Sequence, residues 1–138
     1  MTIAQYRLLL IIFVVTGIAG GVLDLVFPAL LPEAFHDAQR AYDDALSTSR
    51  VTFFLITALA TLGLGVASTY GLFVLRSWAP RLALVTTALA VVIWPLSGPM
   101  AESGIAAALN YLSSYLWGAA VVLANVPPLN AVFQRRDG

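Results

Sequence analysis

Apolar residues gather along this chain into four long stretches that are separated by short polar segments. The stretches cover about residues 7–31, 51–75, 80–98 and 104–126. A helix needs roughly twenty mostly apolar residues to cross a hydrocarbon core of about 30 Å. We therefore expect an all-α, polytopic membrane protein, in which residues 1–138 form a single bundle of four transmembrane helices.

The polar segment between the first two stretches, residues 33–47, carries an apolar stripe of its own. Phe35, Ala38, Tyr42 and Leu46 recur at spacings of three or four residues, and charged residues occupy the other faces. This spacing predicts a short amphipathic helix that lies on the membrane surface or caps the bundle.

The remaining connections are short and rich in turn-forming residues. The turn at 76–81 makes the second and third spans antiparallel neighbours, and the loop at 97–103 contains Gly98 and Pro99. Pro127-Pro128 ends the last span, because proline cannot continue the helical hydrogen-bond ladder. The tail at 127–138 is then short and polar.

A cleaved signal peptide is an alternative for the beginning of the chain. Arg7, a short apolar run and the small residues at Gly17-Ile18-Ala19 are typical of such a segment. The apolar run resumes at once as far as Leu31, and this continuation favours a full transmembrane span.

Composition supports the membrane interpretation and narrows the chemistry. Apolar residues make up 60% of the chain and charged residues 10%, against about half and about a quarter in soluble domains. A soluble protein of this size could not bury so much apolar surface, so we expect membrane lipids as its surroundings. The formal net charge is zero, and nothing indicates a nucleic-acid partner. There is no cysteine, so disulfides and thiolate metal sites are excluded.

The arginines predict the orientation. Five lie on one side of a four-span arrangement, whereas the other side carries Arg40 and Arg50 among acidic residues. The positive-inside rule places the arginine-rich side in the cytoplasm. We expect a multi-pass protein of the bacterial inner (plasma) membrane with both termini cytoplasmic and the segment 33–47 extracytoplasmic. The five arginines are Arg7, Arg76, Arg81, Arg135 and Arg136.

Asp24 is the one ionisable residue clearly inside an apolar stretch. It lies eight residues before Pro32, or about 12 Å along a helix, which places it in the outer half of the membrane. It shares a helix face with Gly17 and Gly20, where another helix can approach closely. A carboxylate inside a span is a functional hypothesis by default. The structural alternative is that Asp24 pairs with Arg50, or is protonated and bonded to a neighbour.

The fourth span adds an amide at a similar depth. Asn110 and Ser114 lie on a stripe with Ser103, Ala107 and Gly118. Asn110 either shares a pocket or a hydrogen bond with Asp24 or serves helix packing. Three aromatic side chains of this span could line a cavity for a flat apolar ligand or fill the space between helices: Tyr111, Tyr115 and Trp117.

Two stripes of small or hydroxylated residues run along the second span. Together with glycines in the first span they predict tight packing of at least one helix pair, either within the chain or between subunits. The stripes are Ala60, Gly63, Ala67 and Gly71, and Thr57, Thr61, Gly65 and Ser68.

His36 stands beside Glu33 and Asp37, on one helix surface. These groups could bind a divalent ion or act as acid and base. One histidine among scattered carboxylates has no recognised metal-ligand spacing, however, and a solvated polar face is the simpler interpretation. We predict no metal site and no cofactor.

Three functions fit these patterns. The first is a non-enzymatic accessory or assembly subunit that forms a homo-oligomer or binds another membrane protein. The second is a small carrier, channel or ligand-binding protein that uses Asp24 with Asn110, and the third is an enzyme for a lipid-like substrate that uses Asp24, His36 or Asp43. In length and four-span pattern the chain resembles small bacterial inner-membrane families, including DoxX-like proteins. That resemblance implies the architecture and carries over no activity or site.

Overall fold

The computed structural model describes residues 1–97 and 102–134, and all regular secondary structure in these residues is helical. The expected all-helical fold is therefore confirmed. The elements are α1 (Ile3–Val26), η1 (Pro28–Leu30), α2 (Glu33–Asp44), α3 (Thr48–Phe73), α4 (Ala79–Ile93), η2 (Trp94–Ser97), α5 (Gly104–Asn125) and α6 (Leu129–Gln134).

Three of these helices, α1, α3 and α5, are long and apolar enough to cross a membrane, with 24, 26 and 22 residues. Their length and composition indicate a membrane protein. The stretch expected as a span over 80–98 forms the shorter apolar helix α4, of 15 residues, followed by the 3-10 turn η2. Pro95 accounts for the change, because its ring collides with the carbonyl one turn back in a regular α-helix.

The ends of α1 follow from local chemistry. Thr2 and Gln5 form a capping box, in which each side chain accepts a hydrogen bond from the other residue's backbone N–H. The helix ends at Val26 because Pro28 disfavours helical backbone at Phe27. The apolar stretch 7–31 therefore consists of most of α1 and the turn η1.

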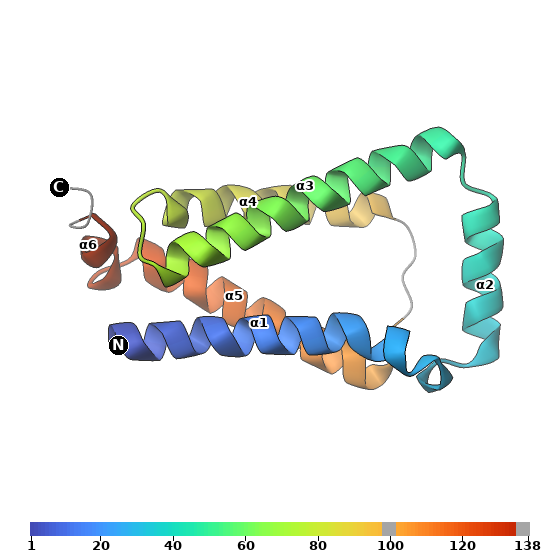
Figure 1. The fold of residues 1–138 in the computed structure, drawn as a ribbon, viewed down its shortest axis with the longest axis horizontal. Coiled ribbons are helices and arrows are strands. Elements are labelled where there is room, and N and C mark those ends of the chain that lie inside the picture. Colours follow the sequence, from blue (N-terminus) through green and yellow to red (C-terminus); the bar gives the residue numbers. More distant parts are fainter. Residues whose placement is uncertain (98–101, 135–138) are drawn as a thin grey trace.

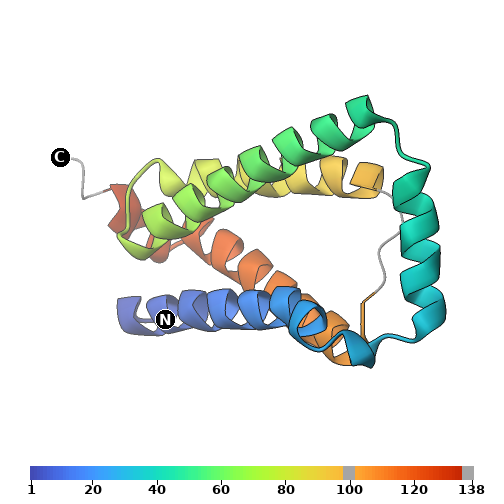
Figure 2. The same ribbon diagram turned by 45° about the vertical axis from the view of Figure 1, so that its right-hand side comes forward.

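The four long helices form two antiparallel pairs (Figure 1). One pair consists of α1 and α5, and the other of α3 and α4. The pairs converge where α6 meets the first turn of α1, and they diverge toward α2, which links α1 to α3 (Figures 1 and 2). We call the end with α6 the closed end and the end with α2 the open end.

The buried core lies at the closed end and draws on all four long helices and α6. Its largest members are Tyr6, Leu10, Leu72 and Phe133. The Tyr6 hydroxyl donates a hydrogen bond to the carbonyl of Ala120 at 3.2 Å. Its ring meets that of Phe133 edge to face, with centroids 6.1 Å apart.

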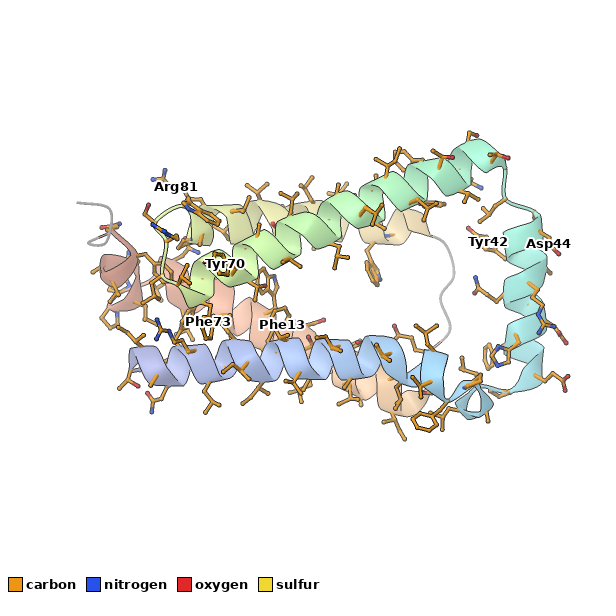
Figure 3. All side chains as sticks on the ribbon, in the orientation of Figure 1. Phe13, Tyr42, Asp44, Tyr70, Phe73 and Arg81 are labelled. Atoms are coloured by element: carbon orange, nitrogen blue, oxygen red, sulfur yellow. The ribbon has the colours of Figure 1, made fainter. Side chains whose placement is uncertain are left out.

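Arg7 joins α1 to the end of α3. Its Nε donates a hydrogen bond to the carbonyl of Phe73 at 3.1 Å. The guanidinium carbon also lies 5.3 Å from the centroid of the Phe73 ring, in cation–π geometry. Figure 3 shows Phe73 extending from α3 toward α1.

The tail forms an element that the sequence analysis did not expect. Instead of a wholly polar segment, it contains α6, whose Leu129 and Phe133 lie one turn apart and are buried. The preceding α5 ends at Asn125, as the following proline pair requires. Arg135 and Arg136, and the loop residues Gly98 and Pro99, lie outside the described residues.

Candidate functional site

Asp24 lies in the last turn of α1, where it meets the beginning of α5. Its Oδ2 accepts a hydrogen bond of 2.8 Å from the backbone N–H of Ser103, the N-cap residue of α5. The Ser103 hydroxyl in turn accepts from the N–H of Ala106. A carboxylate at this position interacts favourably with the positive end of the α5 dipole. Asp24 thus caps α5 from a neighbouring helix.

The second oxygen of the Asp24 carboxyl group, Oδ1, accepts no such hydrogen bond. Oδ1 of Asp24 is buried and has no hydrogen-bond partner among the described residues. A buried acceptor without a donor costs about 1–3 kcal/mol. Oδ1 is therefore an atom at which a proton, a cation or a donor group of a ligand could be held.

Asn110 lies on the adjacent turn of the same interface, against Gly20. A Cβ atom at residue 20 would lie 2.9 Å from Cγ of Asn110 and 3.2 Å from the carbonyl oxygen of Ala106. The glycine therefore makes room for the amide. The Asn110 side chain forms no hydrogen bond within the described residues, so Asp24 and Asn110 are neighbours along the interface without a bond between them.

Arg50 and Ser114 stand apart from this pair. Arg50 is exposed in the first turn of α3, beyond α2, and the described partner of Asp24 is Ser103. Ser114 is exposed, and its hydroxyl donates back to the carbonyl of Asn110 at 2.8 Å. Among the described side chains, to which that of Asp43 does not belong, the one ion pair joins Arg40 and Asp37.

Of the three aromatic candidates on α5, Trp117 is the one that packs inside the molecule. Its ring centroid lies 5.1 Å from that of Phe13, which Figure 3 shows on the side of α1 that faces the other helices. Its Nε1–H donates a hydrogen bond of 2.8 Å to the hydroxyl of Thr87 on α4. Tyr111 and Tyr115 are 65% and 75% exposed and point away from the interface.

Ser113 lies between Asn110 and Trp117 on α5 and packs against α1. Its hydroxyl donates to the carbonyl of Phe13 at 3.1 Å, and a Cβ atom at Gly17 would lie 2.8 Å from its Oγ. Ser113 was not predicted, because the expected polar stripe of α5 passes through Ser114 instead. Steps of three, four and three residues from Ser103 lead through Ala106 and Asn110 to this buried hydroxyl.

His36 lies on α2 and reaches back to the first residue of η1. Its Nε2 is 3.1 Å from the carbonyl oxygen of Pro28. Within the part of the chain that the structure describes, no three His, Cys, Asp or Glu side chains gather to hold a metal ion. The side chain of Asp43, the third candidate acid, lies outside the described residues.

Comparison with protein-family models, with curated proteins and with solved structures found no match to this chain.

Proposed function

We propose that this protein is a non-enzymatic, four-span protein of the bacterial inner membrane that acts as an accessory or assembly subunit. In this proposal α3 binds a transmembrane helix of a second copy or of another membrane protein. The observation that carries the proposal is a face of α3 that no other part of the described chain covers.

This α3 free face consists of exposed residues one turn apart, with small residues along its centre: Ile56, Leu59, Ala60, Gly63 and Val66. A Cβ atom at Gly63 would meet nothing within 4 Å. Small residues let helix backbones approach closely in lipid, where packing rather than the hydrophobic effect drives association. The α3 free face therefore has the composition of a helix-binding surface.

The same stripe supplies an internal comparison. Gly71 continues the line of Ala60 and Gly63 toward the closed end, and there it is buried. A Cβ atom at residue 71 would lie 2.6 Å from the Trp78 ring and 2.7 Å from the Ala79 side chain. Where a neighbour is present, this chain uses a small residue of the stripe for close contact. We infer the same use for Gly63 with a helix from outside.

The four-span part of the proposal rests on the combined length of α4 and η2. At 1.5 Å per residue, the 15 residues of α4 cover about 22 Å, and the four residues of η2 add about 8 Å. Together they reach about the thickness of the hydrocarbon core. The antiparallel pairs then bring both ends of the described chain to the closed end (Figure 1). Arg7, Arg76 and Arg81 belong to this end, because Arg7 contacts the end of α3 and the other two lie at the turn from α3 into α4. The positive-inside rule favours a cytoplasmic closed end and an extracytoplasmic α2.

Photo-crosslinking in native membranes tests the helix-binding proposal. The chain has no cysteine, so Ala60→Cys can be labelled selectively with a benzophenone maleimide. Ala19→Cys, at an exposed alanine of α1, is the matched control. We expect a strong protein adduct from residue 60 and little from residue 19. Gly63→Leu should abolish the adduct without unfolding the protein, since nothing lies near Gly63.

The mass of the adduct distinguishes a second copy from another membrane protein. Equal crosslinking from residues 60 and 19, or a strong adduct that persists with Gly63→Leu, would contradict the proposal.

A second candidate function is a small carrier or ligand-binding protein that uses Asp24 with Asn110. The buried, unpartnered Oδ1 of Asp24 favours it, together with the unbonded amide on the adjacent turn. The substitution Asp24→Asn, treated in the Discussion, separates this candidate from a purely structural Asp24.

A further inference from the structure

A cavity of about 540 Å³ lies at the closed end, between the beginning of α4, the end of α5 and α6. We propose that it binds the phosphate-bearing headgroup of an anionic membrane lipid. Its polar lining includes Arg81, Asn125, Asn130 and Gln134. The proposal does not depend on the α3 free face, which lies on another helix.

The first argument is unbalanced charge. The described chain has three arginines at the closed end, Arg7, Arg76 and Arg81, whereas no Asp or Glu occurs at residues 1–23, 45–97 or 103–134. Arg7 is engaged with Phe73. Arg81 is exposed and forms no ion pair or hydrogen bond with the described residues. An arginine fork without a partner beside a cavity suits a phosphate group.

The second argument is the set of neutral donors around Arg81. Asn130 and Gln134 lie four residues apart on α6 and therefore share one face. Asn125 uses one amide hydrogen for the carbonyl of Val121, at 2.8 Å, and keeps a second. These amides and the guanidinium come from three elements and surround one volume, which lies within the usual range for a small-ligand site of about 300–1,000 Å³.

The third argument favours a lipid over a soluble phosphate compound. One turn from Arg81 along α4 lie Leu84 and Val85, and one turn before Asn125 on α5 lies Val122. All three side chains are exposed. A polar site thus continues directly into apolar surface on both helices. This arrangement matches a ligand with a charged head and acyl chains, and basic pockets between membrane helices recognise such headgroups.

Native mass spectrometry of the full chain in detergent tests the proposal. The probes are phosphatidylglycerol and phosphatidylcholine of identical acyl chains. Arg81→Gln is compared with Arg50→Gln, a matched control because both arginines are exposed and occupy the third position of a helix. We expect preferential binding of phosphatidylglycerol, weakened about tenfold by Arg81→Gln through loss of a charge-assisted hydrogen bond. Arg50→Gln should leave the binding unchanged.

A third arm adds inorganic phosphate in large excess. Retention of phosphatidylglycerol supports a lipid site, whereas its displacement assigns the site to a soluble phosphate compound and overturns the lipid proposal. Equal binding of the two lipids, or equal effects of the two arginine substitutions, overturns it as well. Because Arg81 has no ion pair or hydrogen bond with the described residues, we expect an unchanged melting temperature of Arg81→Gln, which verifies that folding is intact.

Discussion

The two helix pairs are held together in different ways. The α1–α5 pair has polar contacts along its whole length, from Tyr6 near one end to Asp24 at the other. In the α3–α4 pair the side-chain hydrogen bond between the helices joins Ser68 and Thr86, at 3.0 Å. The buried residues of α3 lie toward its closed end, from Ser68 onward.

Glycine shows the same contrast. Gly17 and Gly20 of α1 each face a polar side chain of α5 so closely that no Cβ atom fits. Gly63 and Gly65 of α3 have nothing within 4 Å of a Cβ position. Gly71 of α3, in contrast, is packed against Trp78 and Ala79, so glycine serves internal packing at some positions and lies on an open surface at others. The sequence composition does not tell a packed glycine from an exposed one. The distinction depends on whether a side chain of another helix faces the glycine.

The largest effect we expect comes from filling the α1–α5 interface. Gly20→Leu places a side chain where Asn110 and the Ala106 carbonyl already lie, and such overpacking costs about 1–3 kcal/mol. Gly21→Leu is the matched control, since nothing lies within 4 Å of its Cβ position. Unfolding by sodium dodecyl sulfate in mixed micelles measures both. A similar loss for the two variants would show that α1 and α5 do not meet at Gly20.

A smaller effect is expected at Asp24, and it separates a structural from a functional carboxyl group. Asp24→Leu removes the acceptor for the Ser103 N–H and should lower the free energy of unfolding by about 1–2 kcal/mol. Asp24→Asn keeps an oxygen at this position, and we expect a stability close to that of the unchanged protein. The same mixed-micelle titration compares them, and equal losses would contradict the capping role.

The Asp24→Asn protein also tests the second candidate function. If Oδ1 holds a proton or a cation, this stable variant should lose binding or transport, because an amide cannot carry the negative charge. If the Asn variant keeps full binding or transport, the role of Asp24 is limited to capping α5.

The sequence was sufficient for the three long apolar helices α1, α3 and α5 and for one face of α1. Gly17, Gly20 and Asp24 were expected to share a face, and the structure puts that face against α5. Their spacing of four and three residues is the periodicity of helices that cross at a shallow angle. Nothing in the spacing says which helix is the partner, so pairing with α5 required the structure.

On α5 the predicted stripe drifted by one residue. The stripe passed through Ala107, Ser114 and Gly118, whereas the residues that meet α1 include Ala106, Ser113 and Trp117. Steps of four residues turn slightly beyond a full helical turn, so a repeated choice of four leaves the interface.

The tail helix was missed for a different reason. Leu129 and Phe133 are only two apolar residues, and they are buried because they join a core cluster that includes Tyr6, whose ring meets that of Phe133.

The smallest expected effect concerns the joint between the two pairs. Trp117 of α5 donates to Thr87 of α4, and this hydrogen bond connects the α1–α5 pair to the α3–α4 pair. Trp117→Phe keeps a ring against Phe13 and removes the donor, while Thr87→Val removes the acceptor. A double-mutant cycle in the mixed-micelle titration should give a coupling energy of about 0.6 kcal/mol, the average for such bonds within membranes.

The matched cycle uses Ser68→Ala and Thr86→Val, which remove the hydrogen bond inside the α3–α4 pair. Both cycles should give couplings of similar size, because each removes a single neutral hydrogen bond. Their consequences should nevertheless differ. Loss of the Trp117–Thr87 bond removes one of the contacts between the pairs, so hydrogen exchange should rise in α4 and α5 together. Loss of the Ser68–Thr86 bond should instead raise exchange in α3 and α4. The same exchange pattern in both cycles would mean that the chain opens as one unit and that the two pairs are not separate bodies joined at the closed end.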